Sequence, residues 1–179
     1  FQTAQKAARV LISDAQRDLI NVPGALDARK MLVSEGLRYL EALSKDAAGN
    51  IELRRDLAFA YTQVSQVQWS MNNPHLGDAA GAAVSMAKSV ELWRQLFREV
   101  PSEPHCRGLV SALLALGGLY EQSGKKDEQM SLAKEGVAAA ERFAQAAPSD
   151  VGALQQWGNA RFALALALRV SDHAGRIQA

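Results

Sequence analysis

Residues that could support catalysis or metal binding are few, and they are scattered along the chain. His75, His105 and His173 are far apart in the sequence and share no motif. Cys106 directly follows His105, but as the only cysteine it cannot form an internal disulfide. No second pair of ligands follows at the spacing of a metal site. We therefore expect surface or capping roles for the histidines, and a half-buried thiol at the start of a helix.

Glu52, Arg55 and Asp56 are the residues that most resemble an acid/base cluster. Charged residues at this spacing on a helix more often form a solvated face of ion pairs, worth tenths of a kcal/mol. The serines and the cysteine lack a histidine and an acid in a recognisable nucleophile arrangement. The sequence therefore predicts no catalytic residue, no metal and no cofactor, and a non-enzymatic role for this chain.

The charge balance argues against two kinds of partner. Twenty basic and nineteen acidic residues are interspersed and give a net charge of +1. A nucleic-acid-binding surface would show as a basic stripe, and a membrane-binding segment as a polybasic run. The densest basic group, which is Arg38, Lys45, Arg54 and Arg55, has acidic residues among it. The most apolar stretch, residues 163–168, is far shorter than the roughly 20 residues that span a bilayer. We expect no nucleic-acid partner and no direct membrane insertion.

The elements that must position these residues are helices, and one stretch defines their pattern. In residues 107–124, leucines and a tyrosine recur at spacings of four, three and four, which is one face of a helix. Gly117 lies on that face, and we interpret it as a point of close approach by a neighbouring helix; Gly124 is a candidate C-terminal cap. A similar stretch begins 52 positions earlier, at Arg55. Its Leu57, Tyr61, Val64 and Ser65 correspond to Leu109, Leu113, Leu116 and Gly117.

Periodicity and breakers predict an all-α fold of about seven antiparallel helices in a right-handed superhelix, forming a single domain over residues 1–179. The expected helices are about 2–20, 25–47, 51–71, 79–100, 103–124, 127–147 and 151–170, with Asn50, Asp78 and Ser102 as N-caps. They form the pairs 2–47, 51–100 and 103–147, and the helix over 151–170 is left unpaired. Residues 171–175, SDHAG, resemble GDAAG at 77–81 and are expected to begin a further, truncated helix.

The last predicted helix is a looser third copy of the repeat. If the copies are aligned at their starts, Leu154, Trp157, Arg161 and Leu164 take the places of Leu53, Leu57, Tyr61 and Val64. Alignment at the ends of the helices gives a different register, and the sequence leaves this choice open.

The aromatic residues divide into core candidates and one candidate contact. Trp93, Phe97 and Trp157 lie on helical stripes and are expected in the core. Trp69 has two interpretations. It either anchors a partner, since Trp is favoured at binding hot spots, or it packs under the loop over residues 72–81.

The pattern Leu113-x-x-Leu116-Gly117-x-x-Tyr120-x-x-x-Gly124 resembles the first helix of a tetratricopeptide repeat. The repeats here are about 50 residues long, against 34 in that family, so the chain resembles a divergent member. The resemblance implies a concave groove that binds a peptide or a helix. The side chains that it places in the groove are Phe59, Thr62, Gln66 and Trp69 in one copy, and Ser111, Leu114, Gly118 and Glu121 in the next.

A narrower resemblance covers residues 19–25, 28–50, 53–68 and 73–82. These segments are similar to the repeat region C-terminal to bacterial membrane-anchored serine/threonine kinases. The sequence contains no glycine-rich phosphate loop, no HRD-type loop and no DFG. The resemblance implies a sensor or scaffold region that receives protein partners, tethered to a bacterial inner membrane through a longer parent chain. The alternative is a self-association segment, a homodimer that brings attached domains together.

Overall fold

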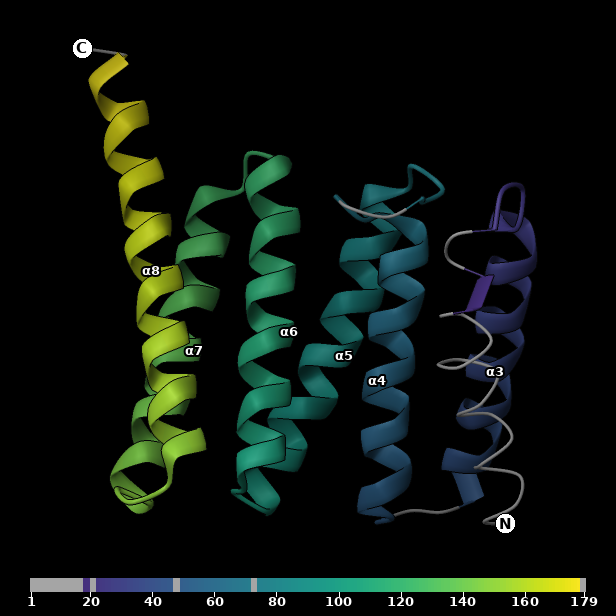
Figure 1. Ribbon diagram of the computed structural model, residues 1–179, viewed down its shortest axis with the longest axis horizontal. Helices are drawn as coiled ribbons and strands as arrows, with labels where there is room; N and C mark the ends of the chain where they lie inside the picture. The colour runs from purple at the N-terminus through teal and green to yellow at the C-terminus, as the bar shows by residue number, and fades with distance from the viewer. Residues whose placement is uncertain (1–17, 20–21, 47–48, 72–73, 178–179) are drawn as a thin grey trace. The chain divides into compact units, whose positions relative to one another are not determined.

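The computed structural model describes residues 18–19, 22–46, 49–71 and 74–177, and every regular element among them is an α-helix (Figure 1). The all-α prediction is confirmed. The predicted helix over 2–20 lies outside the described residues except for Asp18 and Leu19, which are helical. The helices are α3 (Leu26–Asp46), α4 (Ile51–Gln68), α5 (Ala79–Glu99), α6 (Glu103–Gln122), α7 (Lys126–Ala146) and α8 (Val151–Ile177).

Two helix ends differ from the prediction. Helix α4 ends at Gln68 rather than near residue 71, because Trp69 takes an extended backbone with φ −151° and ψ 133°. Helix α8 continues through Ser171 to Ile177, so residues 171–175 do not begin a new helix. The segment that they resemble starts with Gly77, whose φ of +81° ends the preceding loop. Ser171 lacks the freedom that glycine has in that region of backbone space.

Side chains cap three helix starts, and two of these caps, Asn50 and Asp78, were predicted from the sequence. Leu53 N–H donates to Asn50 Oδ1 at 3.0 Å, and Gly81 N–H donates to Asp78 Oδ1 at 2.8 Å. Asp150 caps α8 in the same way, accepting from Ala153 N–H at 3.1 Å. Ser102 has the extended backbone of an N-cap, but its side chain makes no capping bond. These side chains satisfy backbone donors that the first turn of a helix leaves free.

The chain divides into two compact units, residues 1–92 and 93–179, and α5 contributes its first part to one and its last turns to the other. Each unit is described by itself below. The single domain and the right-handed superhelix stay predictions.

In the first unit, small polar side chains join α4 to α5. Ser65 Oγ donates to the carbonyl of Ala82 at 2.9 Å, and Ser89 Oγ donates to the carbonyl of Ala58 at 2.7 Å. All four residues are buried, so each bond satisfies a polar group that would otherwise be costly to bury. The pairing of 58 with 89 and of 65 with 82 makes the two helices antiparallel. A core of Leu53, Leu57 and Ala60 on α4 packs against Leu37 of α3 and Leu92 of α5.

Tyr61 connects α4 to both of its neighbours in this unit. Its hydroxyl donates to a carboxylate oxygen of Glu41 on α3, and Lys88 Nζ on α5 lies 4.9 Å from the centre of its ring. Burial, reinforced by the hydrogen bond and the charge of Glu41, raises the pKa of the Tyr61 phenol. The side chain therefore stays neutral and keeps its donor at ordinary pH.

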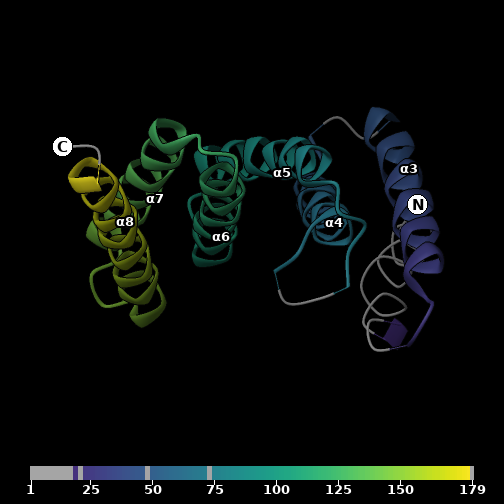
Figure 2. The same cartoon turned by 90° about the horizontal axis from the view of Figure 1, so that it is seen from above.

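In the second unit, α6 and α8 lie on one side and α7 on the other (Figure 2). Gly124, with a φ of +74°, turns the chain from α6 back into α7, as the sequence predicted. Arg94 near the end of α5 forms a double hydrogen bond with Glu135 of α7, at 2.6 Å for each atom pair. Further along the same helices, Phe97 meets the edge of Phe143 with ring centroids 6.2 Å apart. The two contacts run in the same direction along both helices, so α7 is parallel to the end of α5.

The two predicted copies place equivalent residues in equivalent environments. Leu57 and Leu109 are both buried, and so are Tyr61 and Leu113. Ser65 is buried and Gly117, its counterpart, is buried too. The alignment of α4 with α6 is therefore confirmed as a match of buried faces.

Within α6, a neighbouring helix comes closest at Gly108, and the interpretation of Gly117 was wrong. A Cβ added at Gly117 would meet only Gln129 Cγ, at 3.7 Å, which is ordinary contact. A Cβ at Gly108 would lie 2.6 Å from two ring atoms of Trp93, because the indole of α5 lies against the bare backbone of α6. The helical stripe identified Trp93 but could not show which residue it would cover.

We predict opposite effects for two glycine substitutions in α6. Gly108→Ala forces the indole of Trp93 to move and should lower the free energy of unfolding by about 1–3 kcal/mol. Gly118→Ala, where a Cβ meets nothing within 4 Å, should raise it by up to about 1 kcal/mol through helix propensity. Urea unfolding followed by circular dichroism measures both. A Gly108→Ala protein as stable as Gly118→Ala would contradict the contact.

Candidate protein-binding surfaces

Two of the four groove candidates on α4 lie on its outward face. Phe59 is 46% exposed and Gln66 is exposed, whereas the residues directly before and after each of them in the sequence are buried. The same face carries Glu52 and Arg55, which form an ion pair. An apolar ring, an amide and a charged pair in one row can contact an extended peptide or a helix.

The other two candidates on α4 pack within their own unit. Thr62 Oγ1 lies 3.0 Å from Ser89 Oγ, so this side chain is turned toward α5. The half-buried Trp69 ring lies 4.4 Å from the ring of His75, and its Nε1 is buried without a hydrogen-bond partner in the described part of the chain. Arg29 Nη1 on α3 donates to the carbonyl of Pro74 at 3.0 Å and holds the same loop. This arrangement corresponds to the packing alternative for Trp69.

The four candidates on α6 belong to the second unit. Ser111 and Glu121 are exposed, and Leu114 and Gly118 are half-buried. Glu121 accepts a hydrogen bond from Gln129 Nε2 at 3.0 Å. These residues lie along one accessible side of α6 and, unlike the α4 row, include no aromatic side chain.

The residues with possible chemistry have structural positions. His105 is buried with Nδ1 2.8 Å from the Val100 carbonyl at the end of α5, which is a capping role rather than a surface one. His75 Nδ1 accepts from Gly77 N–H at 3.0 Å within the loop. Cys106 is fully buried, not half-buried as expected, because it faces the helices that pack on α6. The side chain of His173 lies outside the described residues. Among the residues that the structure describes, no group of three His, Cys, Asp or Glu could hold a metal ion.

Asp56 departs from the predicted solvated face. Glu52 and Arg55 are paired near the surface as expected, but Asp56 is only 8% exposed. It lies on the side of α4 that also carries Leu53 and Ala60, which is buried by the neighbouring helix. The spacing of charged residues in the sequence does not show which of them will be buried against a neighbouring helix.

The aromatic core predictions hold to different degrees. Phe97 is buried against Phe143, and Trp93 is half-buried over Gly108. Trp157 is not a core residue, because its half-buried ring stands at the edge of a hollow on α8, with Arg161 5.2 Å from the ring centre. Its Nε1 is buried without a hydrogen-bond partner among the described residues.

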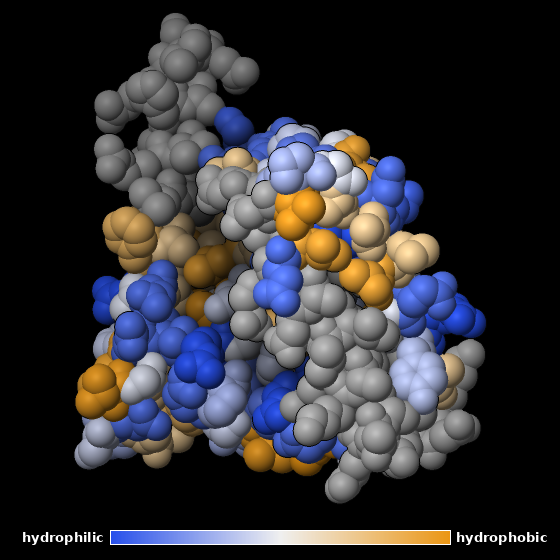
Figure 3. Space-filling view, turned by 45° about the vertical axis from the view of Figure 1, so that its right-hand side comes forward, coloured by the Kyte–Doolittle hydropathy of each residue, from blue (hydrophilic) through white to orange (hydrophobic). Residues whose placement is uncertain are grey.

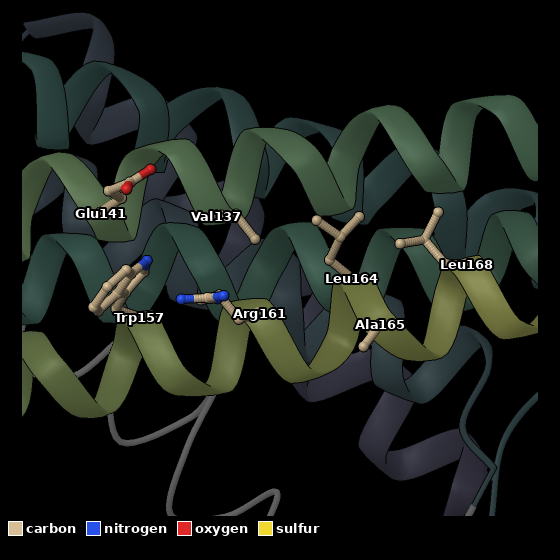
Figure 4. A pocket seen from close by; sticks show the side chains of 7 residues that line it. All are labelled: Val137, Glu141, Trp157, Arg161, Leu164, Ala165 and Leu168. Atoms are coloured by element: carbon tan, nitrogen blue, oxygen red, sulfur yellow. The ribbon is translucent and has the colours of Figure 1, made fainter.

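Sequence reasoning missed this hollow, which lies between α7 and α8 and has a volume of about 440 Å³ (Figure 4). Its α7 side is formed by Val137 and Glu141, and its α8 side by Trp157, Arg161, Leu164, Ala165 and Leu168. The α8 residues recur at helical spacing, and this spacing predicted a core position for Trp157. What the sequence did not show is that no later helix among the described residues covers it.

Exposed apolar side chains are also present elsewhere. On the face drawn in Figure 3, they form several separate groups among hydrophilic side chains. On α8, Val151 is 78% exposed and Phe162 is 67% exposed. None of the described helices is long and apolar enough to cross a membrane.

Comparisons with known proteins identify no family. No family model matches the chain, and no curated protein matches it. Two solved structures described as "DHF119 filament" and "DHF58 filament" are similar to it, with TM-scores of 0.42 and 0.40 and sequence identities of 18% and 20%. Each alignment covers 96% of this chain, and 83% and 84% of the two other chains. At these values the similarity says nothing about function.

Cys106 provides a test of the α6 packing. Burial, with a smaller contribution from the charge of Glu103, raises the pKa of its thiol from 9.0 to about 11. The folded protein therefore keeps a proton that the unfolded chain releases, and this site lowers stability as the pH rises from 9 toward 11. We expect the free energy of unfolding to fall more steeply over this range in the native protein than in Cys106→Ala, by at most about 1.4 kcal/mol per pH unit.

The measurement is urea unfolding of both proteins at several pH values. Parallel pH profiles would contradict the buried thiol. The comparison with Cys106→Ala removes the contributions of the lysines and tyrosines, which titrate in the same range in both proteins.

Proposed function

We propose that this chain is a non-enzymatic protein–protein interaction module. The observation that supports this best is the outward row on α4. Phe59 stays 46% exposed on a helix whose other residues, apart from Glu52 and Gln66, are buried or half-buried, and the exposed amide of Gln66 lies on the same face. Aromatic side chains on rigid helices are typical anchors for a partner, because their binding costs little conformational entropy.

We further propose that the module is the sensor or scaffold region of a bacterial serine/threonine kinase signalling protein. The support for this context is the resemblance of residues 19–25, 28–50, 53–68 and 73–82 to the repeats of such kinases. In that role the helical repeats receive a protein partner, and the parent chain supplies catalysis and the attachment to the membrane.

Self-association is the second candidate function. It is favoured by the exposed apolar residues of α8, among them Val151 and Phe162. Pairing of two chains through such residues would bring attached domains together. Sedimentation at several protein concentrations separates the two functions, because only self-association predicts a mass that rises with concentration.

The α4 surface is tested by site-specific photo-crosslinking in cells of the source organism. A photoreactive phenylalanine at Phe59 should give a discrete cross-linked partner. The same group at Val84, which is 61% exposed on α5, serves as a control for an exposed apolar position. Phe59→Ala with Gln66→Ala should weaken binding of the identified partner by roughly 30-fold, the scale of one hot spot, and leave stability within about 0.5 kcal/mol.

Val84→Ala should change neither quantity. Identical cross-links from Phe59 and Val84, or unchanged affinity in the double variant, would contradict the proposal. A large loss of stability in the double variant would place these side chains in the packing instead.

A further inference from the structure

The outward face of α8 carries a stripe of apolar residues, which we call the α8 stripe. Its members lie on successive turns of the helix, and all of them are exposed: Val151, Leu154, Gly158, Phe162 and Ala165. Two of them, Val151 and Phe162, are 78% and 67% exposed. The buried residues of α8 lie on its opposite side, where α6 and α7 pack: Ala153, Gln156 and Ala160.

Helix α4 shows how a second helix packs on the equivalent side in this fold. Ala58 and Ser65 lie 8 and 15 positions after the cap at Asn50. They bond to Ser89 and Ala82 of the antiparallel helix α5. Each of the two helices thus offers a pair of small residues seven positions apart. Because seven residues are nearly two turns, such a pair lies in one line along the helix, and its small side chains allow close packing.

The α8 stripe has residues at the same positions. Gly158 and Ala165 lie 8 and 15 positions after the cap at Asp150, and Val151 precedes Gly158 by another seven. A Cβ added at Gly158 would meet nothing within 4 Å. No helix among the described residues covers this side of α8. The helix therefore presents three residues in the line in which α4 and α5 present two each.

This pattern is complementary to itself. In an antiparallel pair of α8 helices centred on Gly158, the two glycines face each other. Val151 of each chain then faces Ala165 of the other, because both lie seven positions from the centre. Leu154 and Phe162 lie at the same level but on opposite edges of the stripe, so they pass beside each other. A parallel pair would put the two phenylalanines in one layer and the two alanines in the next, and the helices could not keep one spacing.

The α8 stripe carries no charge. Arg161 is the only charged residue between Val151 and Leu168, and its guanidinium lies 5.2 Å from the centre of the Trp157 ring, at the hollow beside the stripe (Figure 4). The other edge of the stripe has two exposed amides, those of Gln155 and Asn159. Two copies of this face can therefore meet without bringing like charges into contact, which is the electrostatic requirement for self-pairing.

We propose that the α8 stripe is a dimerisation surface, on which α8 of a second copy lies antiparallel about Gly158. One patch then serves both chains, as in other two-fold dimers. The inference rests on self-association, the second candidate function, and assigns it a surface; it is independent of Phe59 and Gln66. Because the contact is one helix wide, smaller than the standard of roughly 800 Å² per partner, we expect a Kd above about 1 μM. At lower concentrations the chain is a monomer and the stripe is open to solvent.

The first test is sedimentation equilibrium at concentrations on both sides of this Kd. The mass of the native protein should rise toward that of two chains. Gly158→Lys, at an open position of the fold, should weaken the dimer by at least about tenfold, because two lysines would face each other at its centre. Asn159→Lys adds the same charge at the next residue, which is exposed and outside the stripe, and should leave the dimer unchanged.

The two ways in which this test can fail are distinguishable. A native protein that stays monomeric at every concentration would overturn both the stripe and self-association as a function. A dimer on which Gly158→Lys and Asn159→Lys have equal effects would overturn the stripe alone, because the chain would then associate through another surface.

Disulfide formation between single cysteines in a Cys106→Ala background tests the orientation. Above the Kd, a mixture of Val151→Cys and Ala165→Cys proteins should cross-link, whereas neither protein should cross-link by itself. Val84→Cys, at an exposed apolar position of α5, is the control for random collision and should not cross-link to Ala165→Cys. Cross-linking of each single protein with itself, as a parallel pair requires, or equal cross-linking of the control would overturn the antiparallel dimer.

Discussion

The structure depends on one constraint: the same positions after each helix start must be buried by the neighbouring helices. Leu53, His105 and Ala153 lie three positions after their caps, and all three are buried. Ala60, Ala112 and Ala160 lie ten positions after them and are buried as well. Because a helix shows the same face every three to four residues, this register decides which side chains pack and which meet solvent. Helices that share it can be stacked one after another by the same contacts.

Much of this could be predicted from the sequence, because helix periodicity, caps and turn glycines act locally. The matching of Leu57 with Leu109, the cap at Asn50 and the turn at Gly124 all followed from local patterns. The predictions that were wrong concern contacts between helices. The contact of Trp93 with Gly108, the burial of Asp56 and the open side of Trp157 depend on which neighbour covers which face, and spacing along one helix does not contain that information.

The third copy illustrates the same limit. Alignment at the helix starts placed Leu154 at the position of Leu53, but the cap at Asp150 gives that place to Ala153, which is fully buried, while Leu154 is 45% exposed. The sequence left the register of α8 open. The hydrogen bond from Ala153 N–H to Asp150 Oδ1 decides it, because this bond marks where the helix begins. In this register Trp157 and Arg161 correspond to Leu109 and Leu113 of α6. The two leucines are buried, whereas the two α8 residues line a hollow.

The most direct measurement of the shared register is thiol labelling of single cysteines in a Cys106→Ala background. Cysteines replacing Ala60, Ala112 and Ala160 should all react slowly, because each of these positions is buried. Cysteines replacing Ser65 and Gly117 should also react slowly, whereas one replacing Ala165 should react about as fast as an exposed thiol. Slow labelling at 165, or fast labelling at 160, would contradict the account.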